Sequence, residues 1–163
     1  MPDTGFKGKI DISINLKPLQ ELQRKSPEMF KKAQKVAAIQ FLTWANNGSA
    51  NTSRKPPIRW GVLRGSSSGF VGDVLISIFP SVIKPGAPDE ISPAESYSGK
   101  EYVITWVWNT DYAARLHETE WDPGIFSTQD GDTGNKWVEI HLLKDKDDLM
   151  KVIGLEFKRL SGI

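Results

Sequence analysis

The sequence contains no cysteine and no long apolar run, and each absence excludes a class of protein. Without cysteine, the chain cannot form a disulfide framework, a zinc site with thiolate ligands or a cysteine nucleophile. Its apolar runs are far shorter than the ~20 residues that a membrane-spanning helix needs. The opening stretch, MPDTGFKGKIDIS, lacks the apolar core of a signal peptide. We therefore expect no membrane partner.

A strong net charge is absent as well, since 21 Lys and Arg are balanced by 20 Asp and Glu. A dedicated nucleic-acid binder would concentrate positive charge, so this class is disfavoured. The charges are nevertheless divided along the chain. Residues 1–64 carry 12 Lys and Arg against 4 Asp and Glu, whereas residues 65–163 carry 9 against 16. Either the two halves of neighbouring copies attract each other, or folding mixes the charges and the division has no function.

Hydrophobic periodicity predicts an α+β fold, with residues 1–163 forming one domain. Apolar residues spaced three and four apart predict a long helix that begins after Ser26 and ends near Asn47. A second amphipathic helix is predicted from Asp145 to the C-terminus, and a short one over residues 111–118. The two long helices are expected to pack against a mainly antiparallel sheet.

Alternating or β-branched residues predict the strands of this sheet. They are expected at residues 10–16, 70–79, 102–108 and 137–143. Two long loops, 80–100 and 119–136, contain several prolines, glycines and acidic residues. The first loop could be the tip of a long hairpin made by the strands on either side of it. Loops of this length in a compact domain usually have a function.

The familiar catalytic and metal-binding motifs are not found. The pair His117-Glu118 lacks the second histidine of a zinc-protease helix, and GSSSG at residues 65–69 lacks the pattern of a nucleophile elbow. Four acidic residues of the second loop do not have the spacing of a calcium-binding EF-hand, so a solvated loop is the plainer interpretation; they are Glu120, Asp122, Asp130 and Asp132. We predict no catalytic residue, no cofactor and no metal. A small hydrolase, if present, would use His117 as its base.

Six tryptophans suggest a second class of function. Trp44, Trp106 and Trp108 fall on faces predicted to be buried, where core packing is the default role. The other three flank loops and could form an exposed carbohydrate- or receptor-binding site or a subunit contact; they are Trp60, Trp121 and Trp137. Basic residues near Trp60 also leave single-stranded nucleic-acid binding open; they are Arg54, Lys55, Arg59 and Arg64.

Two stretches, PPIRWGVLRGSSSGFVG (residues 56–72) and YVITWVWNTDYAARLHE (residues 102–118), carry short patterns in a fixed order. The first pattern is made by Gly61, Leu63, Arg64 and Ser66, and the second by Thr110, Tyr112, Ala113, His117 and Glu118. A third, GNKW, covers residues 134–137. With a helix on either side, these patterns resemble a family of minor structural proteins of tailed bacteriophages, called tail-completion, neck or head–tail joining proteins. Trp60 departs from the threonine usual in that family.

This resemblance implies a structural protein of the virion and not an enzyme. Six copies would form a ring in the neck, made in the host cytoplasm. The ring would lie between the head connector or stopper and the tail terminator or tail tube. DNA would pass through its channel with only transient, nonspecific contact.

The motif residues and their neighbours are then candidates for interfaces. They are Arg59, Trp60, Gly61, Leu63, Arg64, Tyr112, His117, Glu118, Glu120 and Trp121. Gly61 would permit a tight turn, and Leu63 would anchor it in the core. The forked Arg64 guanidinium could pair with Glu118 or Glu120, within one subunit or across two, or form an ordinary surface pair. The loops 80–100 and 119–136 are expected to contact neighbouring proteins.

Overall fold

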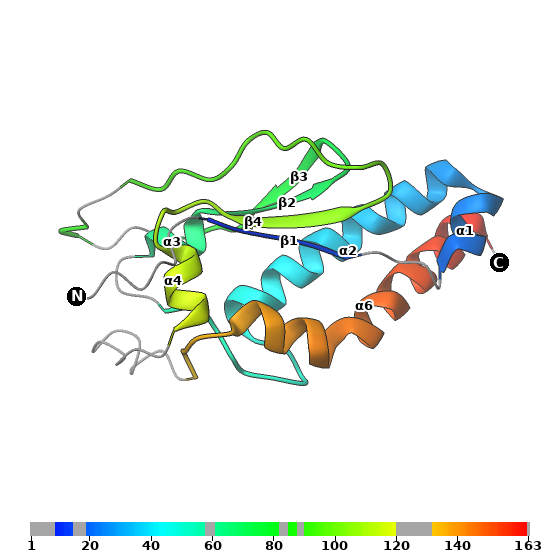
Figure 1. Cartoon of the computed structure of the whole chain (residues 1–163). Coiled ribbons are helices and arrows are strands. Elements are labelled where there is room, and N and C mark those ends of the chain that lie inside the picture. Colours follow the sequence, from blue (N-terminus) through cyan, green and yellow to red (C-terminus); the bar gives the residue numbers. More distant parts are fainter. Residues whose placement is uncertain are drawn as a thin grey trace.

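The computed structural model describes residues 9–14, 19–57, 61–81, 85–87, 90–119 and 132–162. Its strands form one antiparallel sheet in the order β1-β4-β2-β3. The strands are β1 (Ile10–Ile14), β2 (Ser67–Val71), β3 (Val74–Ile78) and β4 (Ile104–Trp108). The helices are α1 (Gln20–Lys25), α2 (Pro27–Asn47), α3 (Val62–Gly65), α4 (Ala113–Glu118) and α6 (Trp137–Ser161). The fold is therefore α+β, and α2 and α6 lie side by side on one side of the sheet (Figure 1).

Helix α2 matches its prediction closely. Pro27 occupies the first turn, where its missing N–H costs nothing, and Gly48 ends the helix with φ 89°. Ser26 is the N-cap residue, but its side chain makes no capping hydrogen bond. The predicted stripe of Phe30, Ala33, Ala37 and Phe41 is buried, and Trp44 at its end is partly buried against the core.

Strand β4 is the centre of the core, because all five of its residues are buried. The Trp106 ring lies 4.3 Å from that of Phe41, and its Nε1 donates a hydrogen bond of 2.9 Å to the Ala38 carbonyl. Gly69 of β2 leaves room for this indole on the neighbouring strand, since a Cβ at position 69 would lie only 3.2 Å from the Trp106 ring. Both predicted core tryptophans of this strand, Trp106 and Trp108, are fully buried.

The face of the sheet away from α2 is covered by the long connection before β4. We call residues 91–102 the strap; it passes over the sheet in an extended conformation (Figure 1). The Tyr97 ring of the strap lies 5.6 Å from that of Phe70, which is fully buried. At one end, Asn109 donates a hydrogen bond of 3.0 Å to the Ser92 carbonyl. The strap explains why β4 is buried on both faces.

The predicted strand at residues 70–79 is wrong, because the chain turns within it. Gly72, with φ 61°, and Asp73 form the turn of a hairpin between β2 and β3. The sheet also has a bulge between Gly69 and Phe70. The predicted long hairpin with residues 80–100 at its tip is wrong too. Strand β4 pairs with β2 and β1, so the strap must carry the chain back across the sheet.

The predicted strand at residues 137–143 is also wrong: helix α6 begins at Trp137, not at Asp145. Alternation of Val138, Ile140 and Leu142 suggested a strand, but only Val138 of these three is fully buried. The buried residues of α6 instead recur mostly at intervals of three and four; they are Trp137, Val138, His141, Asp145, Leu149, Ile153 and Phe157. A helical stripe thus includes two polar residues that the strand interpretation overlooked.

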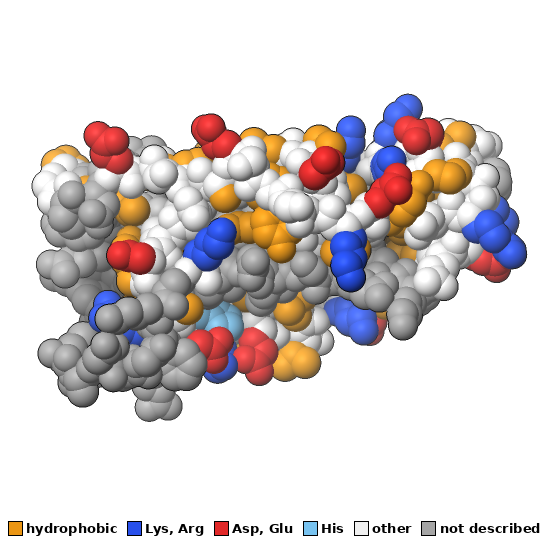
Figure 2. All heavy atoms as spheres, turned by 45° about the horizontal axis from the view of Figure 1, so that its top comes forward, with side chains coloured by type: hydrophobic (Ala, Val, Ile, Leu, Met, Phe, Trp, Pro, Cys, Tyr) orange, Lys and Arg blue, Asp and Glu red, His pale blue; other side chains and the backbone are white. Residues whose placement is uncertain are grey.

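The charge division along the sequence is partly mixed by folding. Lys31 pairs with Glu101 at 2.9 Å, and Arg54 approaches Asp132 at 3.4 Å, so each pair joins the two halves. Acidic and basic side chains are interspersed on the face shown in Figure 2. No helix in the part of the chain that the structure describes is both long and apolar enough to cross a membrane.

Candidate functional site

The first sequence motif forms a buried turn that enters the sheet. Gly61 has φ 85°, a left-handed conformation that favours glycine, and directly precedes α3. Its carbonyl accepts hydrogen bonds from the Gly65 amide at 3.0 Å and the Ser81 hydroxyl at 2.9 Å. Leu63 is buried in the hydrophobic core. Both residues therefore act as the sequence predicted, as a turn and an anchor.

Arg64 is buried, with only 5% of its surface exposed. Its Nε and Nη2 both donate to the Pro56 carbonyl, at 3.1 and 2.6 Å, which fixes the loop before the motif. The expected pair with Glu118 within one subunit is not formed, because Glu118 pairs with Lys136 and His117 instead. The alternative partner, Glu120, lies outside the described residues. Arg64 supports the turn from within and is not a surface side chain.

The second motif joins α4 to the start of α6. Tyr112 is the N-cap residue of α4 and packs, partly buried, against the core. His117 is buried, and its ring meets that of Trp137 edge to face, with 4.9 Å between the centroids. The Lys136 amide donates to the His117 carbonyl at 2.8 Å. Lys136 is the N-cap residue of α6 and has φ 56°, a left-handed conformation.

The electrostatics of this junction keep His117 neutral. Burial lowers its pKa below the ordinary 6.5, and this effect outweighs the neighbouring Glu118 carboxylate, which raises it. The pKa of Glu118 is lowered, mainly by its hydrogen bond from Lys136 and then by that from His117. His117 Nδ1 lies 2.7 Å from a Glu118 oxygen, so Nδ1 carries the hydrogen of the neutral ring.

His117 is consequently placed to hold two helices together. Its Nε2, the nitrogen that would act as a base, is buried and has no hydrogen-bond partner in the described part of the chain. A general base must reach a proton on a bound substrate, and burial denies this nitrogen that access. The geometry therefore gives no support to the hydrolase hypothesis.

Of the three tryptophans expected at a sugar-binding surface, the structure describes only Trp137. Trp137 was predicted to flank a loop and lie exposed; this is wrong, since it is fully buried as the first residue of α6. Trp60 and Trp121 lie outside the described residues, as do the interface candidates Arg59 and Glu120. Residues 120–131, which make up most of the acidic loop, also lie outside the described residues. Among the His, Asp and Glu residues that are described, no three converge as metal ligands.

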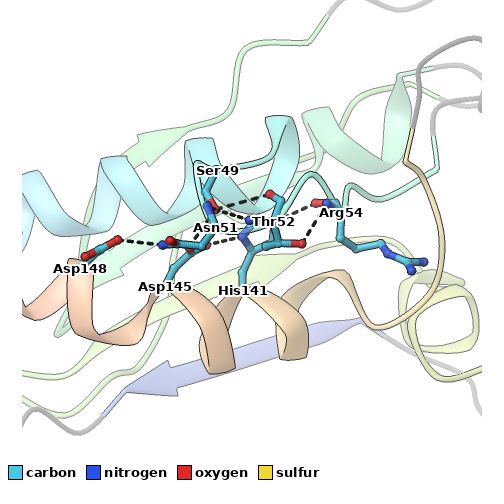
Figure 3. A network of polar contacts seen from close by, with 7 residues as sticks. All are labelled: Ser49, Asn51, Thr52, Arg54, His141, Asp145 and Asp148. Atoms are coloured by element: carbon cyan, nitrogen blue, oxygen red, sulfur yellow. Dashed lines mark hydrogen bonds and ion pairs between the residues drawn. The ribbon is translucent and has the colours of Figure 1, made fainter.

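A polar cluster that the sequence reasoning missed joins the loop after α2 to α6 (Figure 3). At its centre, Asp145 is fully buried. One of its carboxylate oxygens accepts from the Ser49 hydroxyl at 2.7 Å and from Asn51 Nδ2 at 2.9 Å, and the other faces His141 Nδ1. Asn51 also donates to Asp148 at 2.7 Å. The spacing of four between His141 and Asp145 would have indicated this cluster, had residues 137–143 been recognised as a helix.

This cluster contains serine, histidine and aspartate, but it is not a catalytic triad. In a triad the histidine lies between the other two and removes the serine proton. Here Asp145 lies between them, and His141 Nε2 lies 2.7 Å from the Arg54 carbonyl. His141 and Asp145 are both fully buried. The arrangement can fasten a loop but cannot activate Ser49.

The comparisons give no family. No protein-family model, curated protein or solved structure matches the chain.

The open edge of the sheet is the described surface best suited to a protein partner. Strand β3 ends the sheet and pairs only with β2 among the described residues. Its sequence, VLISI, contains no charge and no proline. Val74 is 52% exposed and Ile78 is 38% exposed. Natural proteins usually protect such an edge with charges, prolines or a covering segment, because its free backbone groups pair readily with another strand.

Proposed function

We propose that this protein is a structural subunit of a bacteriophage neck. Copies of it would form a ring, with six as the expected number, between the head connector or stopper and the tail terminator or tail tube, and DNA would pass through the channel. The order of the short motifs in the sequence, which resembles that of neck proteins, is the first support for this proposal. The observed order of elements agrees with it: a long helix, a proline-bearing loop, the buried Gly61 turn, strands, α4 and a C-terminal helix.

The observation that carries the proposal is the edge strand β3, which has no charge or proline and pairs only with β2 among the described residues. A ring needs two different surfaces on each subunit, one that fits the other on the next copy. The sheet offers such a pair, because β1 ends it on one side and β3 on the other. Neighbouring strands are antiparallel throughout, so β1 of the next copy placed beside β3 would continue the alternation. Exposed Val74 and Ile78 would become buried there.

The buried positions of the motif residues also support a structural role. Leu63, Arg64 and His117 are each at least nine-tenths buried and contact neighbouring segments of the same chain. They stabilise the turn and the helix junction from which the surface is built. Their contribution to assembly would be indirect, through the shape of the subunit, and the contacting side chains would lie elsewhere.

Quantitative mass spectrometry of purified virions tests this proposal. The chain should be present at a few copies per particle, in a ratio to the portal protein consistent with a single ring. Its absence from particles would refute the proposal. Titration of the isolated protein with glycans, followed by tryptophan fluorescence, tests the carbohydrate-binding alternative. Saturable quenching would favour that alternative and count against a purely structural role.

A further inference from the structure

The polar cluster of Figure 3 constrains the protonation of His141. Both ring nitrogens face oxygens that accept hydrogen bonds: Nδ1 faces the Asp145 carboxylate and Nε2 faces the Arg54 carbonyl. A neutral imidazole has one N–H and can donate to only one of them. For both contacts to be hydrogen bonds, the His141–Asp145 pair must hold one proton more than a neutral ring and an ionised carboxylate.

The other contacts decide where this proton lies. The second Asp145 oxygen accepts from Ser49 and Asn51, and hydrogen bonds to a carboxylate favour its ionised form. The extra proton therefore belongs to the histidine. No charged group of α2 faces the pair among the described contacts: from this helix, His141 meets the Phe41 ring edge to face, with 6.4 Å between the centroids. Of the other charged groups nearby, Asp148 is occupied by Asn51 and Lys151, and the Arg54 guanidinium approaches Asp132.

The loop that His141 contacts, residues 49–55, in turn holds residues 132–134 in place. Lys55, next to Arg54, donates its amide to the Asp132 carbonyl at 2.9 Å and accepts from the Gly134 amide at 3.1 Å. The Ser49 hydroxyl accepts from the amides of Asn51 and Thr52, both at 3.2 Å, which shapes the loop. The cluster thus fixes residues 132–134, where the chain enters α6.

We propose that His141 carries a hydrogen on both ring nitrogens, and that this buried His–Asp pair is a proton-dependent clasp holding residues 49–55 on α6. Loss of the second hydrogen would break one of the two histidine contacts and loosen residues 132–134 together with the loop. The clasp is independent of the proposed neck function. It would operate in an isolated subunit as well as in a ring.

Nitrogen NMR of the intact protein labelled with ¹⁵N-histidine tests the protonation directly. The chain has only two histidines, and His141→Gln identifies the signals of His141 by subtraction. We expect both nitrogens of His141 to show directly bonded hydrogens. Only one such nitrogen in the wild-type ring would overturn the proposal, whatever the variants do.

Asp145→Asn provides a matched test of the clasp. Its amide could donate to Nδ1 of a neutral His141 while its oxygen still accepts from Ser49 and Asn51, so the loop should stay in place without the extra proton. We expect one N–H on His141 in this variant. Exchange of the Lys55 and Gly134 amides should be at least tenfold faster in His141→Gln than in the wild type, because the clasp is lost. Asp145→Asn should exchange at the wild-type rate, and an equal rise in both variants would refute the clasp.

Discussion

Replacement of Gly99 by alanine should dislodge the strap from the hairpin that it crosses. A Cβ added at this position would lie 2.2 Å from the Gly72 carbonyl oxygen and 2.9 Å from its carbon. These are backbone atoms of a tight turn, and Gly72 is further fixed by a 2.9 Å hydrogen bond from its amide to the Val103 carbonyl. Neither atom can rotate away as the end of a side chain could, so the strap itself must move.

Overpacking of this kind typically costs about 1–3 kcal/mol, and we expect Gly99→Ala to lower the free energy of unfolding by that amount. Displacement of the strap should also separate Tyr97 from Phe70, whose rings lie 5.6 Å apart. Urea unfolding followed by circular dichroism measures the first effect. NMR cross-peaks between the two rings measure the second.

Gly154→Ala is the matched control. Gly154 lies in the interior of α6, and a Cβ there would have no atom within 4 Å. Alanine is better than glycine in a helix by roughly 0.5–1 kcal/mol, so this variant should be more stable than the wild type. The two glycine-to-alanine changes are thus expected to have opposite signs. A neutral or stabilising Gly99→Ala would show that the strap does not lie against the hairpin turn.

Two further predictions concern the motif residues. Because burial lowers the pKa of His117 below 6.5, the unfolded chain binds a proton that the folded chain resists, so the free energy of unfolding should fall as the pH drops below 6.5. Urea titrations between pH 7.5 and roughly pH 5 should show a shallower fall for His117→Gln, and equal slopes would contradict the neutral buried ring. Arg64→Ala removes both donors to the Pro56 carbonyl and should destabilise the fold by about 1–3 kcal/mol in the same assay. The exposed Arg24→Ala should cost less than about 0.5 kcal/mol, and similar losses for the two would refute the buried role of Arg64.

The parts of the fold that were predictable are those with a strong local pattern. Helix α2 has a proline at its start, a glycine at its end and a continuous apolar stripe, so its bounds could be read from the sequence. The five residues of β4 alternate between two apolar faces, and both faces are buried. In each case the residues that decide the structure are neighbours along the chain, and tertiary contacts agree with the local preference.

The errors arose where tertiary contacts decide between two local patterns. Residues 137–143 fit a strand by alternation and a helix by the spacing of Trp137, His141 and Asp145, and the polar members of the helical stripe concealed it. Burial of a histidine and an aspartate on that stripe becomes reasonable only when the loop at Ser49 supplies their partners, a contact between distant parts of the sequence.

The candidate site was predictable in part. The turn at Gly61 and the anchor Leu63 follow from residue type alone. The pairing of Arg64 did not, because a guanidinium accepts carbonyl as well as carboxylate partners, and the sequence does not show that Pro56 lies within reach. The open edge at β3 was hidden for another reason. The hairpin turn at Gly72 and the strand order of the sheet must both be known before β3 can be placed at its end.

The most direct test of assembly through the sheet edge is incorporation of a Val74→Lys chain into virions. A lysine on an edge strand opposes pairing with another strand, and Val74 is 52% exposed, so the variant should still fold. Leu143→Lys is the control, because Leu143 is 78% exposed and lies on helix α6, which is not part of the sheet. With both variants folded by circular dichroism, we predict that Leu143→Lys enters particles at the wild-type level and Val74→Lys is excluded at least tenfold. Equal incorporation of the two would contradict the account.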